Sequence, residues 1–192
     1  MKIIDIQNNQ HLQEFVATKQ HVKYLFFWGH KEKLNQVSKS CFSQWYNAGF
    51  SVNGIHYATA EHYMMAEKAR LFSDNTAEQK IIAATTPGEA KKLGRSVYNF
   101  NEALWNQKRF DIVVQGNLEK FRQNHRIRDF LLKTGERILV EASPVDKIWG
   151  IGLASDSSDV ENPFKWKGLN LLGYALMVVR KKLSTSSSIK SI

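Results

Sequence analysis

The chain has 192 residues, with 27 Lys and Arg against 18 Asp and Glu, so its formal net charge at pH 7 is +9. This length is typical of one domain, and a composition that is 43% hydrophobic and 23% charged excludes a chain that is disordered throughout. The single cysteine, Cys41, excludes an intrachain disulfide framework and favours a reducing compartment. We expect one compact domain over residues 1–183 and a flexible, serine-rich tail over residues 184–192.

The sequence predicts a cytoplasmic protein with no membrane partner. No apolar run reaches the roughly 18 to 20 residues of a membrane span, and the first residues lack the hydrophobic stretch of a signal peptide. The excess of basic residues is spread over residues 1–60, 61–140 and 141–192 as +3, +4 and +2. Its densest cluster, around Lys120 to Arg128, is typical of a solvated helix face, and an anion-binding surface is the alternative.

Strands are expected in the first third of the chain. Asn53-Gly54 is a strong hairpin-turn signal and predicts paired strands over residues 50–52 and 55–57. Thr59 can then cap a helix that begins at Ala60, because its hydroxyl can accept from a free N–H of the first turn. Two further predicted strands are Lys2–Ile6 and Tyr24–Trp28, and residues 30–47 are expected to be irregular.

Helices dominate from residue 60 onward. Pro87 suits the first position of a helix and Asn170 can cap the last one, whose apolar faces indicate a central place in the core. One more strand, over residues 138–142, precedes a long loop over residues 144–168. The chain is therefore expected to be an α+β domain, mostly helical, with a small β-sheet. The predicted helices cover residues 60–72, 76–84, 87–94, 101–124, 126–132 and 171–183.

The helix that begins at Ala60 carries an acid and a base on an otherwise apolar face. Glu61, Met64, Met65 and Lys68 have the spacing i, i+3, i+4 and i+7, so they share one side of the helix. Glu61 also lies in the first turn, where the helix dipole favours its carboxylate form. These two charged residues are candidates for chemistry, and the alternative is that both extend to solvent at the edge of the domain.

A second candidate segment is the turn that follows the strand ending at Glu141. It presents Asp146, Trp149 and Gly150, and a tryptophan offers a flat face for a planar base while a glycine allows close backbone approach. The alternative is a tight turn in which Trp149 fills the core. Trp105, which precedes Lys108 and Arg109, is typical of core packing too.

The sequence gives no support for a metal or a cofactor. It lacks a GxxxxGK[ST] phosphate loop and a GxGxxG turn after a strand. His56 and His62 lie near each other, but one histidine pair without further ligands is poor evidence for zinc. We therefore expect no metal and no cofactor.

Several separated motifs resemble the YbiA-like, or NADAR, family. The segment from Ala60 to Ala69 matches the helix motif EHYxxAxK of that family. The resemblance continues in the same order and covers about three-quarters of the chain, through Thr86-Pro87, Gly94-Arg95, Trp105 with Arg109, Lys120-Phe121, Leu139-Val140-Glu141, Asp146-x-x-Trp149-Gly150 and Asn170-Leu171-Leu172-Gly173.

The resemblance implies a hydrolase that acts on N-glycosyl bonds. Relatives hydrolyse the ribose–amine bond of phosphoribosylamino-pyrimidine intermediates of riboflavin biosynthesis, and others remove ADP-ribose from guanine in nucleic acid. The implied partner is thus a small phosphoribosyl or ADP-ribosyl substrate, with ADP-ribosylated nucleic acid as a further possibility. The alternative from another class is a module that binds ADP-ribose or a nucleotide without cleaving it.

The resemblance also assigns roles. Glu61 would move protons or activate water, Lys68 could capture the ring-opened sugar as a Schiff base, and Asp146 could hold the ribose or stabilise the cation. The implied substrate-binding residues are Trp149, Gly150, Arg95, Trp105, Arg109 and Asn170. Two positions depart from the family pattern: Gln44 stands where relatives usually have asparagine, and Leu169 where some have a lysine whose phosphate contact Lys165 or Lys167 would have to supply.

Overall fold

The computed structural model describes residues 3–31 and 36–188, and it confirms the α+β class with a mostly helical chain. No helix within these residues is both long enough and apolar enough to cross a bilayer. In chain order the elements are the 3-10 turn η1 (Ile3–Asp5), α1 (Asn9–Ala17), β1 (Tyr24–Phe27), the 3-10 turn η2 (Lys39–Phe42), β2 (Phe50–Val52), β3 (Ile55–Tyr57), α2 (Ala60–Leu71), α3 (Asn75–Ala83), α4 (Pro87–Arg95), α5 (Glu102–Gln123), α6 (His125–Leu132), β4 (Ile138–Glu141) and α7 (Leu171–Ser188).

The described strands form two separate pairs. The predicted hairpin is confirmed, since β2 and β3 pair in antiparallel fashion around Asn53 and Gly54. Both turn residues have positive φ angles, of 50° and 80°, as a type I′ turn requires. The other pair is parallel and joins segments more than a hundred residues apart, because β1 lies beside β4 with Phe27 opposite Glu141. The carboxyl ends of both parallel strands therefore meet at one edge.

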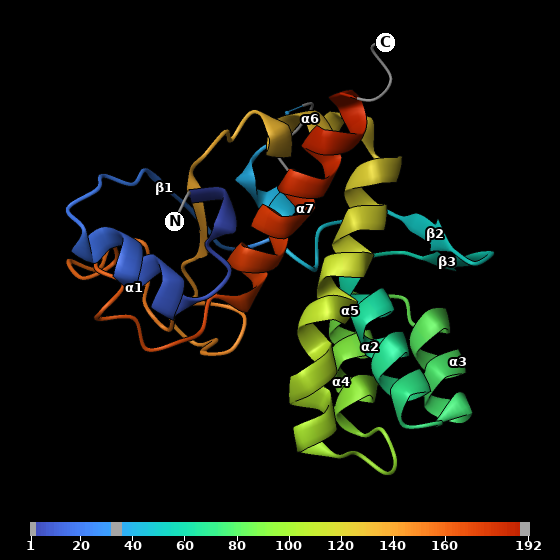
Figure 1. The fold of residues 1–192 in the computed structure, drawn as a ribbon. Coiled ribbons are helices and arrows are strands. Elements are labelled where there is room, and N and C mark those ends of the chain that lie inside the picture. The colour runs from blue at the N-terminus through green and yellow to red at the C-terminus, as the bar shows by residue number, and fades with distance from the viewer. Residues whose placement is uncertain (1–2, 32–35, 189–192) are drawn as a thin grey trace.

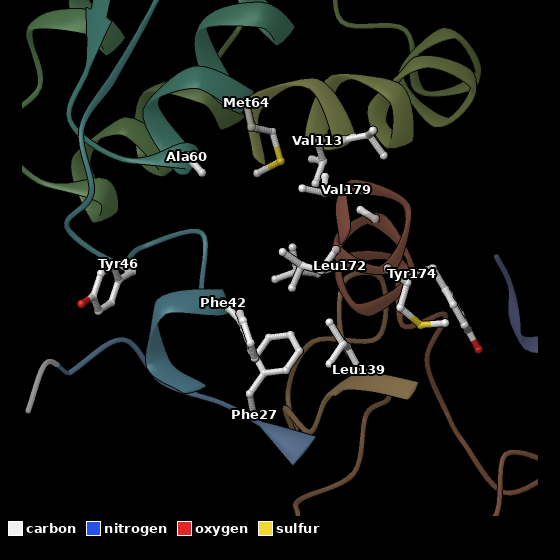
Figure 2. Close-up of a cluster of buried hydrophobic side chains, with 14 of the residues drawn as sticks. Phe27, Phe42, Tyr46, Ala60, Met64, Val113, Leu139, Leu172, Tyr174 and Val179 are labelled. Carbon is white, nitrogen blue, oxygen red and sulfur yellow. The ribbon is translucent and has the colours of Figure 1, made fainter. Parts of the chain in front are cut away.

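Helix α2 is enclosed by its neighbours. It packs against α3, α4 and α5, while α7 runs beside α5 and covers β4 (Figure 1). Nine of its twelve residues are buried for this reason, which is far more than the single apolar face of an ordinary surface helix. In Figure 2, side chains from η2, β1, β4 and α7 face the same interior, among them Phe42, Phe27, Leu139 and Leu172.

The N-terminal prediction was wrong. Of the predicted strand Lys2–Ile6, Lys2 lies outside the described residues, and residues 3–5 form a 3-10 turn closed by a hydrogen bond from the Ile6 N–H to the Ile3 carbonyl (3.2 Å). The helix α1 that follows was not expected, because its sequence is polar apart from a few positions. Asn8 caps it, and it buries Leu12 and Phe15. At the other end of the chain, α7 continues five residues beyond its predicted end at residue 183.

Candidate active site

A cavity of about 290 Å³ lies where α2, α4, β4 and the loop after β4 meet. Its described lining includes three carboxylates and three cations drawn from segments far apart in the sequence. The lining residues are Ser43, Gln44, Trp45, Glu61, Met64, Met65, Lys68, Lys91, Arg95, Trp105, Glu141, Asp146, Ile148, Trp149 and Leu172.

The first turn of α2 holds Glu61 in a fixed position. The Thr59 side chain accepts a hydrogen bond from the His62 N–H, so the predicted cap is present. The Glu61 N–H, which has no partner within the helix, donates to the Gln44 carbonyl (3.0 Å). The Glu61 residue is 3% exposed and Lys68 is 8% exposed. Both are therefore enclosed, and neither extends to solvent at the edge of the domain.

Burial makes the Glu61 carboxyl group a weak acid. Loss of hydration raises its pKa to about 7, opposed by the positive charge of Lys91 and by a hydrogen bond from the Trp45 side chain. Its Oε1 atom is buried and has no hydrogen-bond partner in the described part of the chain. Glu61 can thus hold or release a proton near neutral pH, and one of its oxygens is available to a ligand.

Glu141, at the end of β4, is a second acid of the same kind. Burial and, to a smaller extent, the negative charge of Asp146 raise its pKa to about 8, while the positive charge of Lys91 opposes the shift. Its Oε2 atom is also buried without a partner among the residues described. Glu61 and Glu141 repel each other in their ionised forms, so the pair favours states that retain a proton.

Asp146 contributes through a different local structure. Its Oδ1 atom accepts hydrogen bonds from the backbone N–H groups of Ile148 and Trp149, each at 2.8 Å, and its own N–H donates to the Ser143 hydroxyl (3.1 Å). These bonds fold the loop after β4 into a tight turn that directs the carboxylate and Trp149 to the same cavity. Trp149 is half-buried, lines the cavity and packs against the core.

Lys68 lies between a carbonyl group and two aromatic rings. Its Nζ atom donates to the Gly94 carbonyl (2.7 Å) and lies 4.2 Å from the ring centroid of Phe100 and 5.6 Å from that of Trp105. Burial lowers the pKa of this ammonium group, and the positive charge of Arg95 lowers it further. Such an amine loses its proton more readily than a lysine in water, which is a requirement for a nucleophile.

Helix α4 supplies the other two cations because it approaches α2 closely. A Cβ atom on Gly94 would lie 2.1 Å from the Met65 sulfur, so only glycine permits this helix contact. Lys91 and Arg95 are one helical turn apart on α4, and both line the cavity. The Lys91 Nζ atom also lies 5.8 Å from the ring centroid of Trp45.

Asn170 does not line the cavity but binds the two segments that form part of its wall, β4 and the turn at Gly150. Its side-chain amide donates to the Leu139 carbonyl and accepts from the Glu141 N–H, both at 3.0 Å, so both of its functional groups are bound to β4. The residue is fully buried and has a positive φ angle of 53°. Its own N–H donates to the Gly150 carbonyl (3.1 Å), which ties the turn to the start of α7. Asn170 and Gly150 thus shape the cavity wall from outside its lining.

Arg109 lies beside the cavity on α5. Its side chain is partly buried, and its Nε atom has no hydrogen-bond partner in the part of the chain described. Burial lowers the pKa of this guanidinium, while the charges of Glu102 and Asp146 raise it. Trp105, one turn earlier on the helix, does line the cavity and also packs against the core.

A buried lysine and a buried asparagine on α5 hold the wall formed by residues 43–45. Lys120 Nζ donates to the carbonyls of Cys41 and Ser43, each at 2.8 Å. Asn117 Nδ2 donates to Gln44 Oε1 (2.7 Å). Burial lowers the pKa of Lys120 to about 8.

The cavity contains six of the nine site residues predicted from the sequence: Glu61, Lys68, Asp146, Trp149, Arg95 and Trp105. It adds five polar or aromatic residues that sequence reasoning did not select, namely Ser43, Gln44, Trp45, Lys91 and Glu141. A signal existed for Glu141, an acid at the end of a buried strand, and for the Gln44-Trp45 pair in an irregular segment. The sequence carried no signal for Lys91, because a lysine at this position is typical of the solvent-exposed face of a helix.

Comparison with known proteins places this arrangement in a family. The NADAR domain model matches residues 26–184. An N-glycosidase of Acanthamoeba polyphaga mimivirus is 45% identical over 83% of this chain and 96% of its own length. An N-glycosidase of Nostoc punctiforme is 36% identical over 79% of this chain and 90% of its own length.

Two further matches extend the comparison. A riboflavin biosynthesis protein of Vibrio vulnificus is 30% identical over 73% of this chain, which corresponds to 35% of the Vibrio protein. The solution structure of the E. coli protein YbiA superimposes with a TM-score of 0.70 at 25% identity, covering 88% of this chain and 89% of YbiA. The fold and the sequence motifs agree, and the chain belongs to the NADAR domain family, whose members include the N-glycosidases named above.

Proposed function

We propose that this chain is an N-glycosidase that hydrolyses the ribose–amine bond of a phosphorylated ribosylamine, and that it does so in the cytoplasm. The observation that carries the proposal is the cavity in which Glu61, Lys68 and Asp146 meet the ring of Trp149. The N-glycosidase names of the mimivirus and Nostoc relatives support the reaction type. The lone buried cysteine supports a reducing compartment.

Glu61 and Glu141 would divide the proton transfers. Cleavage needs a proton on the departing nitrogen, whose bond electrons leave with the amine, and a water molecule that adds to the anomeric carbon and gives up a proton. Two carboxyl groups whose pKa values lie at about 7 and about 8 can hold one proton between them near neutral pH. The protonated member serves as the acid, the ionised member as the base, and Asp146 faces the positive charge that develops on the sugar.

Lys68 offers a covalent variant of the same reaction. A glycosylamine can open its ring to an imine, which the neutral Lys68 amine attacks while the substrate's amine departs; water then hydrolyses the new Schiff base and restores the lysine. The depressed pKa of Lys68 and its position beside Gly94 and Trp105 support this route.

The remaining residues suit the ends of such a substrate. Trp149 would stack on the heterocycle, Trp105 would bound the sugar, and Arg95, Lys91 and Arg109 would face the phosphate. A volume of about 290 Å³ is close to the lower limit of roughly 300 Å³ for ligand pockets, which favours a mononucleotide-sized substrate over an enclosed ADP-ribose. We therefore rank a phosphoribosylamino-pyrimidine, as the name of the Vibrio relative suggests, above ADP-ribosyl-guanine.

Turnover of the two candidate substrates tests the proposal. The purified protein is incubated with a phosphoribosylamino-pyrimidine or with an ADP-ribosylated guanine oligonucleotide, and released ribose phosphate or ADP-ribose is measured by mass spectrometry. Glu61→Gln and Lys68→Met should each lower kcat at least about a hundredfold, while Glu14→Gln, at an exposed position on α1, should not. Binding of either compound without release on long incubation would favour the non-catalytic module instead.

Borohydride distinguishes the two routes. If Lys68 forms a Schiff base, reduction during turnover adds the mass of the sugar phosphate to the protein, and Lys68→Met abolishes the adduct. Normal turnover without an adduct leaves direct attack by water.

A further inference from the structure

The Gln44 side chain presents a buried hydrogen-bond donor that no described residue uses. Gln44 is 6% exposed and lines the cavity, and its Nε2 atom is buried without a partner among the residues described. Two other cavity residues, Glu61 and Glu141, have unpartnered buried atoms as well, but theirs are carboxyl oxygens. Gln44 thus adds to a carboxylate-rich wall a neutral group that can donate. A buried donor without a partner destabilises a protein, so its presence in the cavity lining indicates a ligand.

The orientation of this amide follows from its neighbours. Asn117 Nδ2 lies 2.9 Å from the Val113 carbonyl, which can only accept, so the asparagine must direct its NH₂ group there. The same NH₂ group lies 2.7 Å from the Gln44 side chain, which must then direct its oxygen to Asn117. Because the Gln44 oxygen is bound to Asn117, the Nε2 atom of Gln44 remains available to donate a hydrogen bond to a ligand.

The surroundings of Gln44 select the kind of acceptor. Its backbone carbonyl accepts the Glu61 N–H, so the residue lies next to the group that we propose acts on the scissile bond. Because Glu61 and Glu141 line the same cavity, a phosphate beside Gln44 would meet the negative charge of whichever acid is ionised, in a dehydrated setting. The phosphate is better served by Arg95, which is exposed. The group that faces Gln44 is therefore an uncharged oxygen.

We infer that Gln44 is a specificity-determining residue whose Nε2 atom donates a hydrogen bond to an uncharged oxygen of the substrate close to the scissile bond. The inference rests on the proposed function. Two sources of this oxygen share the chemistry: a ring carbonyl of the heterocycle and a hydroxyl of the ribose. A site built to hydrogen-bond a group discriminates strongly against an analogue that lacks it, because the buried donor then stays unpaired.

The test compares wild-type protein with Gln44→Met by calorimetric or NMR titration with pairs of probes that differ in one oxygen. For the carbonyl the pair is guanosine 5′-monophosphate and 2-aminopurine riboside 5′-monophosphate. For the hydroxyl it is ribose 5-phosphate and 2-deoxyribose 5-phosphate. Inorganic phosphate is the third probe. Gln44→Met should fold, because Asn117 keeps its bond to the Val113 carbonyl, and its thermal unfolding is measured alongside.

We expect wild-type protein to bind the oxygen-bearing member of one pair at least about tenfold more tightly, and Gln44→Met to reduce that preference to within about twofold. The pair that responds identifies the source of the oxygen. Binding of inorganic phosphate should be the same in both proteins. Asn117→Leu keeps Gln44 but frees its amide to rotate, so it should lower the same preference.

Two outcomes overturn the inference: a preference that survives in Gln44→Met for both pairs, or no preference in wild-type protein for either pair. Loss of phosphate binding in Gln44→Met would overturn the assignment of an uncharged oxygen. Because these titrations measure binding alone, they do not depend on turnover. Absence of turnover in wild-type protein would refute the proposed function alone. Normal turnover, with no effect of Gln44→Met on the binding preference, would refute this inference alone.

Discussion

Lys68 on α2 donates its hydrogen bond to the carbonyl of Gly94, the penultimate residue of α4 (2.7 Å). The bond exists because α4 lies so close to α2 that Met65 occupies the space where a Gly94 side chain would stand. A contact between two helices therefore fixes the amine that we propose as a nucleophile. Gly94 thus both permits the contact between the two helices and supplies the carbonyl that holds Lys68.

Gly94→Ala should damage both stability and turnover. The added methyl group would meet the Met65 sulfur at 2.1 Å, so α4 must move away and carry the acceptor of Lys68 with it. Overpacking of this kind costs about 1 to 3 kcal/mol. Gly88→Ala, on the same helix, is the control, because its Cβ would make an ordinary contact with Trp45 at 3.6 Å. Urea unfolding and kcat should separate the two variants, and equal values for both would contradict the packing argument.

The buried carboxyl groups should make the protein less stable as pH rises. The pKa of Glu61 is about 7 in the folded state against 4.5 ordinarily, so between these values the native state holds a proton that the unfolded state has lost. Stability is therefore greatest below about pH 4.5 and falls as pH rises to about 7, by up to roughly 3 kcal/mol for this group. Glu141, whose pKa is about 8, extends the fall to higher pH.

Replacement of these acids should flatten that dependence. Glu61→Gln and Glu141→Gln keep the shape of the side chain and remove the ionisation, so each should be more stable than wild-type protein at pH 8 and nearly equal to it at pH 4.5. The free energy of unfolding in urea at both pH values provides the measurement. Glu14→Gln, exposed on α1, should follow wild-type protein. If wild-type protein and all three variants show the same pH dependence of the unfolding free energy, the pKa of neither acid is raised.

Lys120 should give the opposite dependence at higher pH. Its pKa is about 8 in the folded state against 10.5 ordinarily, so between these values the unfolded state holds the extra proton and stability rises with pH. The free-energy difference between wild-type protein and Lys120→Met should change by about 1.4 kcal/mol per pH unit over this range. The variant also leaves the carbonyls of Cys41 and Ser43 without their donor, so KM should rise with the displaced wall. If the difference in unfolding free energy between wild-type protein and Lys120→Met does not change with pH, the pKa of Lys120 is not lowered by burial.

Asn170 should act as a positioning residue. Asn170→Ala removes both bonds to β4, to the Leu139 carbonyl and the Glu141 N–H, and should cost about 2 to 4 kcal/mol in stability. Asn99→Ala controls for backbone strain alone, because Asn99 has the same positive φ angle of 53° in an exposed turn. Asn170→Asp keeps the acceptor for Glu141 and should retain more activity than Asn170→Ala. If the two variants at this position have the same kcat, the bond to Glu141 does not position the acid.

Local signals predicted much of the fold. The hairpin followed from Asn53-Gly54, and helix starts followed from Thr59 and Pro87, because a turn or a cap is decided by a few adjacent residues. Helix α1 escaped prediction because distant parts of the chain hold it. Its Asn9 side chain donates to the Gly168 carbonyl and its Gln13 side chain to the Pro163 carbonyl, contacts that no local pattern can indicate.

The site was predictable where one helix face carried it. Glu61 and Lys68 share the inner side of α2, so their spacing indicated a common environment. Lys91 and Gln44 reach the cavity from α4 and from the segment after η2, and only the packing of those segments around α2 brings them there. The sequence did show Asn170 as a motif residue, but it could not show that the side chain bonds β4 instead of facing a ligand.

The enclosure of α2 has a consequence for how substrate preference can change among relatives or in the laboratory. Nearly every side chain of this helix meets another helix, so a substitution on it disturbs the scaffold together with the reaction. The wall formed by residues 43–45 and by the turn with Ile148 and Trp149 is made of loops, in which Lys120 and Asn117 of α5 hold residues 43 and 44 while Ile148 is exposed. Variants with new substrate preferences should therefore be sought by randomising the loop residues of that wall while the sequence of α2 is left unchanged.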